Sequence, residues 1–235
     1  MQNHLLWLIH FYTSLGIPIA ALTLYHCAIG EIKTSFFYMF VAILIDATDG
    51  YFARKYNVSK VLKKFDGKKL DDLVDFLNYV LVPVAMAYIL EILPRNHMIF
   101  GLAPVIASSY GFCQVSAKTE DGFFTGFPSY WNIVIFYLYL FKLSIFYNIL
   151  IFIILSAAVF IPIKYITPFK TKPFSGITDL FCVLWSLNLF VIYIFLPLPP
   201  LWLIILSCPF PIYYFFISIF IHIHKNINVD KSLYF

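Results

Sequence analysis

The chain has 235 residues, of which 62% are hydrophobic and only 12% are charged, and its formal net charge is +4. A water-soluble domain of this size does not need so large an apolar fraction. The composition therefore excludes a soluble globular domain and indicates a polytopic membrane protein.

Eight apolar segments follow one another along the chain, separated by polar loops. They cover residues 5–28, 34–54, 69–92, 97–116, 130–141, 144–164, 177–196 and 200–223. A span needs about 20 residues, so the short fifth segment leaves open whether the fifth and sixth each cross the bilayer. We expect an all-α bundle of about eight transmembrane helices, forming one integral-membrane domain over residues 1–235. Membrane lipids are its expected surroundings, and no nucleic-acid partner is expected.

The distribution of Lys and Arg predicts the orientation of these spans. If the N-terminus is cytoplasmic, thirteen of the sixteen basic residues fall in cytoplasmic segments, and three, Lys33, Arg95 and Lys142, fall in outer loops. Basic residues are enriched on the cytoplasmic side of membrane proteins. Both termini are therefore expected in the cytoplasm, although the loss of one span within 130–164 would reverse everything after it.

Acidic residues concentrate where the second apolar segment ends and the third begins. Six of the twelve lie between Asp46 and Asp75. At about 100° per residue, two sets of small and acidic residues each share one helix face: Asp46, Asp49, Gly50 and Ala53 on the first helix, and Gly67, Asp71 and Asp75 on the next. Two antiparallel helices joined by a short basic loop would bring four carboxylates to one place at the cytoplasmic edge of the membrane.

Four neighbouring carboxylates repel one another, and hard divalent cations relieve that repulsion. All-oxygen ligands favour Mg²⁺ or Mn²⁺ over zinc. Two such ions bridged by carboxylates can clamp a pyrophosphate during displacement at phosphorus. The alternative is that each aspartate reaches water from a helix end and that the small residues serve helix packing.

The stretches D-A-T-D-G-Y-F-A-R and G-K-K-L-D-D-L-V-D resemble the signature DxxDGxxAR…GxxxDxxxD of the CDP-alcohol phosphatidyltransferases. All the fixed positions are present: Asp46, Asp49, Gly50, Ala53, Arg54, Gly67, Asp71 and Asp75. Twelve residues, 55–66, separate the two halves, which is more than in most of the family. This longer gap and the segment D-G-F-F-T-G-F-P-S-Y-W-N are similar to the bacterial phosphatidylcholine synthase branch.

The resemblance implies transfer of a phosphatidyl group from CDP-diacylglycerol to choline, which releases CMP. It implies two divalent metal ions, Mn²⁺ or Mg²⁺, and a bacterial inner membrane with the site facing the cytoplasm. Many members of the family look dimeric, so a homodimer is also compatible with it.

Roles for individual residues are carried over by position. The resemblance implies metal ligation by Asp46, Asp49, Asp71 and Asp75. Asp75 would complete the metal site or act as general base on the choline hydroxyl. The nucleotide would be bordered by Asp49, Gly50, Ala53, Arg54 and Gly67.

Choline needs a further set of residues, because its quaternary ammonium group cannot donate a hydrogen bond and is bound by aromatic faces. Tyr79 lies about 5.4 Å, one helical turn, beyond Asp75 and is the first candidate for such a wall. Tyr130 and Trp131 are second candidates. Interface anchoring or packing is the alternative for each of them in a chain with so many aromatic residues.

Three other readings of the sequence compete with choline transfer. The same chemistry could use another acceptor, as phosphatidylserine or phosphatidylglycerophosphate synthases do. An ion transporter could use intramembrane aspartates, but it would distribute them across bilayer depth. A reversed reaction of CDP-choline with diacylglycerol shares the signature.

Overall fold

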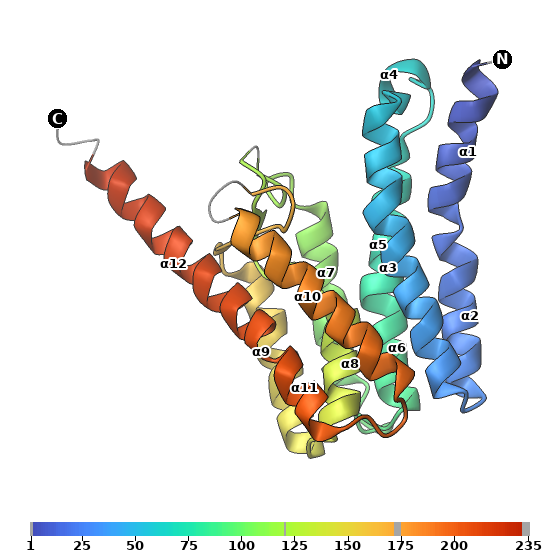
Figure 1. Ribbon diagram of the computed structural model, residues 1–235, viewed down its shortest axis with the longest axis vertical. Coiled ribbons are helices and arrows are strands. Elements are labelled where there is room, and N and C mark those ends of the chain that lie inside the picture. The colour runs from blue at the N-terminus through green and yellow to red at the C-terminus, as the bar shows by residue number, and fades with distance from the viewer. Residues whose placement is uncertain (1, 120, 172–174, 232–235) are drawn as a thin grey trace. The chain divides into compact units, whose positions relative to one another are not determined.

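The structure is a computed structural model that describes residues 2–119, 121–171 and 175–231 (Figure 1). The described chain divides into two compact units. Unit 1 comprises Met1–Ser108 and Tyr130–Phe152, and unit 2 comprises Ser109–Ser129 and Ile153–Phe235. The assignment of residues 1–235 to a single domain stays a prediction.

Unit 1 is helical. Its elements are α1 (Gln2–Ser14), α2 (Gly16–Ala28), α3 (Ile32–Lys55), α4 (Val58–Val61), α5 (Gly67–Phe76), the π-helix η1 (Leu77–Leu81), α6 (Val82–Ile89) and α8 (Trp131–Phe141). The helices α7 (Ile99–Cys113) and α9 (Ile145–Phe160) begin in it. Apolar residues dominate each of the longer helices, as expected where the surroundings are lipid.

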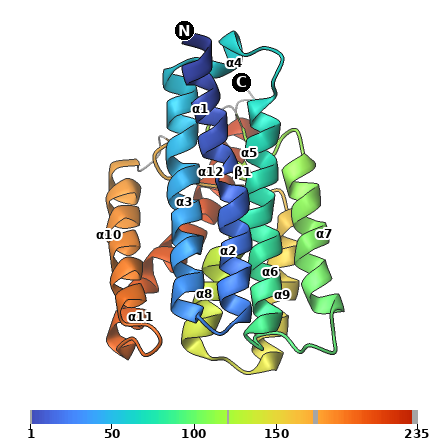
Figure 2. The same ribbon diagram turned by 90° about the vertical axis from the view of Figure 1, so that its right-hand side faces the viewer.

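Three long helical lines of unit 1 lie side by side (Figure 2). The first, α1 and α2, bends at Leu15 and ends near Gly30, whose φ of +85° favours glycine. The chain then returns as α3 along α2. After the single turn of α4 it reverses again into the continuous line α5–η1–α6. The chain therefore places the end of α3 and the start of α5 at the same end of unit 1.

The interior of unit 1 is made of large apolar side chains with a few satisfied polar groups. Phe36 and Phe136 are fully buried and meet edge to face, with ring centroids 5.0 Å apart. Trp131 is also fully buried, and its indole Nε1 donates to Ser108 Oγ at 2.9 Å. Such packing of rings and small polar residues holds helices together where lipid gives no hydrophobic drive.

Unit 2 combines apolar helices with a small strand pair. Its further elements are α10 (Ser175–Ile194), α11 (Leu201–Ser207), α12 (Pro209–Lys231), β1 (Phe124–Thr125) and β2 (Lys164–Tyr165). The two strands are antiparallel, with Phe124 opposite Tyr165. The sequence did not predict this ladder, because two-residue strands leave no periodic signal.

All eight predicted apolar segments are helical, but only some reach the length of a span. Among the described residues, five helices are long and apolar enough to cross a membrane. They are Leu6–Ala28, Ile32–Lys55, Gly67–Ile89, Ser175–Ile194 and Leu201–His224. Three shorter apolar helices, α7, α8 and α9, cover the remaining segments. The chain is therefore an integral membrane protein with several candidate spans, and the number of crossings and the orientation of the termini stay predictions.

Candidate active site

Three aspartates gather at the end of unit 1 where α3 meets α5. Asp46 and Asp49 lie in the C-terminal half of α3, and Asp71 lies in α5. One carboxylate oxygen from each lies within 4.8 Å of the others. Asp49 is buried, with 3% of its surface exposed, and the other two are half-buried. The structure brings together three of the four carboxylates that the helical spacing predicts to converge.

The loop between α3 and α5 sets the position of Asp71. Asn57 adopts a left-handed conformation, with φ of +50°, and turns the chain into α4. Val58 and Leu62 are buried against Leu6 of α1, which fixes the loop to a third helix. Asp66 then caps α5 by accepting a hydrogen bond from the Lys69 backbone N–H at 3.0 Å. The twelve residues between the two halves of the signature thus form an ordered connection between α3 and α5.

The buried oxygen Asp49 Oδ1 tests whether this cluster fits a metal ion. This atom is out of contact with solvent and has no hydrogen-bond partner among the described residues. A buried carboxylate oxygen with no donor is costly, and a cation satisfies it. Mg²⁺ and Mn²⁺ prefer oxygen ligands. The three carboxylates therefore fit a hard divalent cation.

Asp75 lies outside the group of three. It follows Asp71 by one turn of α5, and four residues advance the helix by about 6 Å along its axis. Its charge lies close enough to act on the Tyr79 hydroxyl. Its role as a fourth ligand or as a base stays a prediction.

The small residues of the signature make room for neighbouring side chains. A Cβ added at Gly50 would lie 3.1 Å from a guanidinium nitrogen of Arg54, so this exposed side chain folds back over the glycine. A Cβ added at Gly67 would overlap the imidazole of His10. No sequence motif singles out His10. Its ring is buried beside that of Phe65, with ring centroids 4.6 Å apart, and its Nε2 has no partner in the described part of the chain.

Comparison with protein families identifies this arrangement. The model of the family described as CDP-alcohol phosphatidyltransferase matches residues 7–213, which is most of the chain. The chain belongs to this family. The matched range includes the α3 and α5 segments that hold the carboxylate cluster.

Curated phosphatidyltransferases of several bacteria are similar to the chain. A phosphatidylcholine synthase of Legionella bozemanae is 48% identical over 132 residues, which are 55% of this chain and 61% of that protein. One of Legionella pneumophila is 38% identical over 69% of this chain and 64% of that protein. One of Borreliella burgdorferi is 32% identical over 81% of this chain and 82% of that protein. The matched part of the chain thus spans about three fifths of the length of the two Legionella proteins.

The aromatic candidates of this family member lie in different surroundings. Tyr79 is half-buried, and its hydroxyl donates a hydrogen bond of 2.6 Å to Asp46 Oδ2. Tyr130 is half-buried and precedes α8. Trp131 is fully buried against Phe152 and bonded to Ser108. Core packing accounts for Trp131, whereas the two tyrosines keep some exposed surface and Tyr79 contacts a carboxylate of the cluster.

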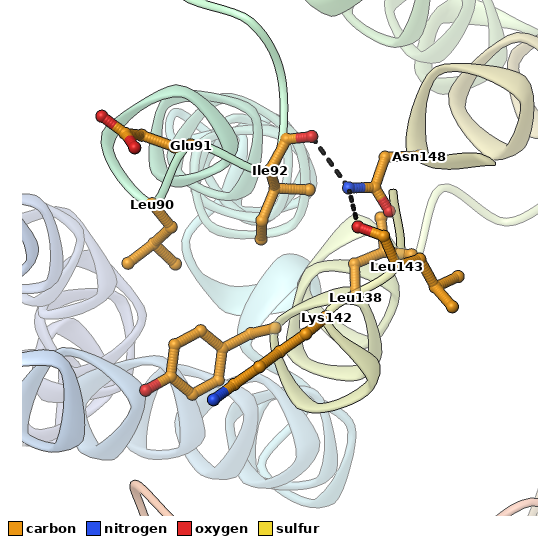
Figure 3. Close-up of a pocket in the computed structure, with 8 residues that line it drawn as sticks. Leu90, Glu91, Ile92, Leu138, Lys142, Leu143 and Asn148 are labelled. Atoms are coloured by element: carbon orange, nitrogen blue, oxygen red, sulfur yellow. Dashed lines mark hydrogen bonds between the residues drawn. The ribbon is translucent and has the colours of Figure 1, made fainter. Parts of the chain in front are cut away.

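A pocket of unit 1 lies at the other end of the α5–η1–α6 line (Figure 3). Its polar groups include Glu91, which follows α6, and Lys142, which ends α8, as well as Asn148 of α9. The Asn148 amide Nδ2 donates to the carbonyls of Ile92 and Leu143, at 2.9 and 3.4 Å. Its Oδ1 is buried and has no hydrogen-bond partner among the described residues. The Asn148 amide therefore links the segment after α6 to the segment after α8.

Proposed function

We propose that this family member is a phosphatidylcholine synthase, which transfers the phosphatidyl group of CDP-diacylglycerol to choline and releases CMP. The observation that carries the proposal is the convergence of Asp46, Asp49 and Asp71 within 4.8 Å. The printed function of several curated relatives supports choline as the acceptor. A cluster of carboxylates at one helix end, and not along the bilayer depth, supports a surface reaction over ion transport.

In this proposal, Asp46, Asp49 and Asp71 hold one or two ions of Mg²⁺ or Mn²⁺. Such ions neutralise charge on a pyrophosphate and stabilise the departing phosphate. The buried Asp49 would be one ligand, because its Oδ1 is shielded from solvent and has no hydrogen-bond partner among the described residues. The exposed Arg54, which folds over Gly50, presents its guanidinium to a phosphate of the nucleotide. Gly50, Ala53 and Gly67 have little or no side chain and therefore leave space for the nucleotide.

Asp75 acts on the acceptor in the same proposal. The choline hydroxyl is a weak nucleophile at neutral pH, and a carboxylate within hydrogen-bond reach can take its proton. The choline oxygen then bonds to the phosphatidyl phosphorus, the bond from that phosphorus to the bridging oxygen breaks, and CMP leaves with the oxygen. The position of Asp75, one turn beyond Asp71, suits this role because it keeps the carboxylate clear of the group of three.

The choline ammonium needs aromatic faces on the acceptor side of Asp75. The ring of Tyr79 lies one turn further along the same helical line, and Tyr130 is the N-cap residue at the start of α8. Each cation–π contact is worth roughly 2 kcal/mol when desolvated. In this proposal the rings of Tyr79 and Tyr130 contact the ammonium group. Trp131 does not contact it, because Trp131 has no exposed surface.

The same proposal places the site at the cytoplasmic face of a bacterial inner membrane. Lys60, Lys63, Lys64, Lys68 and Lys69 surround the loop above the cluster. Each lysine near an anionic leaflet contributes about 1 kcal/mol of attraction. This loop would draw the anionic nucleotide lipid toward the carboxylates, and a homodimer is compatible with the arrangement.

A panel of acceptors tests the function. The purified chain receives labelled CDP-diacylglycerol and Mn²⁺ with choline, serine, glycerol 3-phosphate or inositol, each in a separate reaction. We expect phosphatidylcholine and CMP in equal amounts, with little product from the other three acceptors. Product from serine alone would contradict the choline assignment and would leave the phosphatidyltransferase chemistry in place.

A further inference from the structure

A residue outside the family signature holds one of the cluster's carboxylates. The Tyr79 hydroxyl of η1 donates to Asp46 Oδ2 of α3 at 2.6 Å. This distance lies in the range of hydrogen bonds from a hydroxyl to an ionised oxygen, which are roughly twice as strong as neutral ones. One oxygen of Asp46 is therefore engaged by a neighbouring helical element.

A local break in the helix brings Tyr79 to this position. Pro83 has no N–H, and its ring would clash with the carbonyl four residues earlier, which is that of Tyr79. The chain responds with the wider turn Leu77–Leu81, in which the Val82 N–H bonds to the Leu77 carbonyl, five residues back. Single π-turns of this kind occur often at functional sites. The turn therefore has a sequence cause, and Tyr79 lies at its middle.

The same turn is secured on its other side by Asn78. This buried amide donates Nδ2 to the carbonyls of Gly16 and Val74, both at 3.0 Å. Side chains that satisfy freed carbonyls allow proline-containing helices to persist in a membrane. Because η1 is fixed to the junction of α1 and α2, the Tyr79 ring has little freedom to leave Asp46.

We propose that Tyr79 is a positioning residue for the metal site, acting through its hydrogen bond to Asp46. The inference rests on the proposed metal role of Asp46. Partners that orient a ligating side chain change metal affinity by about 10- to 100-fold when they are removed. Tyr79 thus acts on the cluster through its hydroxyl group. This role is separate from the proposed contact between its ring face and choline.

Binding of Mn²⁺ measures this role without turnover. The full chain in detergent is titrated with Mn²⁺, and free ion is followed by electron paramagnetic resonance. We expect Tyr79→Phe, which keeps the ring and its volume, to raise the Kd for Mn²⁺ by about 10- to 100-fold. Its KM for choline should stay near the original value. Tyr79→Leu, which removes the ring as well, should raise both constants if the ring also faces choline.

Tyr139→Phe is the matched control. Tyr139 is half-buried in α8 and lines the pocket at the far end of unit 1, so its loss should leave Mn²⁺ affinity unchanged. In a double-mutant cycle, Tyr79→Phe should have little further effect once Asp46→Asn is present. Unchanged Mn²⁺ affinity in Tyr79→Phe would overturn the positioning role and leave the proposed function intact. Absence of Mn²⁺ binding by the unaltered chain would overturn both the metal site and this inference.

Discussion

Charged residues are arranged differently at the two ends of the α5–η1–α6 line. At the α5 end, Asp46, Asp49 and Asp71 gather like charges, and Tyr79 holds one of them with a neutral donor. The α6 end lies about 28 Å from Asp71 along the helix axis. There, a carboxylate oxygen of Glu91 lies 3.2 Å from a guanidinium nitrogen of Arg95. Lys142 ends α8, where its positive charge interacts favourably with the helix dipole. Paired charges need no further explanation, whereas gathered like charges do. The difference supports the proposal that a cation binds at the α5 end.

Substitution of the buried carboxylate should give the largest effect. Asp49→Asn keeps the shape of the side chain and removes its charge, so the cluster loses its most buried ligand. We expect the rate of lipid product formation to fall by about 1,000-fold or more, since metal stabilisation is worth several kcal/mol in the transition state. The assay is CMP release, with circular dichroism as a check on folding. A variant that kept more than a tenth of the activity would contradict the metal site.

Asp75→Asn should separate the base from the ligands. If Asp75 takes the choline proton, kcat should fall by about 100-fold or more, because general-base catalysis contributes that much. Mn²⁺ affinity should change little, since Asp75 lies outside the group of three. Parallel loss of Mn²⁺ affinity would instead make Asp75 a fourth ligand.

Gly67→Ala tests the contact between the start of α5 and α1. The added methyl group would overlap His10, so the ring must shift. We expect a loss of about 1–3 kcal/mol of stability, as for other overpacked positions, with a lowered activity. The double variant with His10→Ala should recover part of the stability in thermal unfolding, because the smaller side chain removes the overlap. No recovery would show that Gly67 serves something other than His10.

Glu91→Gln should have the smallest effect and completes the comparison. The Glu91–Arg95 pair is mostly exposed, and exposed pairs contribute about 0–1 kcal/mol. Thermal unfolding and CMP release should both stay close to those of the original chain. A large loss of activity would show that the two ends are coupled and would weaken the contrast between them.

Much of this arrangement is predictable from the sequence. The apolar runs indicate the helices because only helices satisfy the backbone in lipid, and helical spacing puts Asp46 with Asp49 and Gly67 with Asp71. The helical pattern also groups Asp75 with these residues, because it takes account of the angular position of a side chain around the helix axis. It does not take account of the distance between side chains along that axis. The same spacing singles out Tyr79, but its hydroxyl bond to Asp46 depends on the distance between two helices.

Other features have causes that a pattern does not reveal. The π-turn follows from Pro83, yet proline also ends or bends helices, so the residue alone does not determine the outcome. His10 is one polar residue in an apolar run, and only the packing of α1 on α5 brings it to Gly67. Trp131 looks equal to Tyr130 in sequence, although burial separates them in the structure.

The hydrogen bond from Tyr79 to Asp46 also bears on how the site forms during synthesis. Asp46, Asp49, Asp71 and Tyr79 all lie within one short stretch of the chain, so closing the loop between them costs little entropy. All four residues are translated before α7 and the helices that follow it. Contacts between near neighbours in sequence form fast. We therefore expect the metal pocket to assemble in the nascent chain, while the C-terminal helices are still being made by the ribosome.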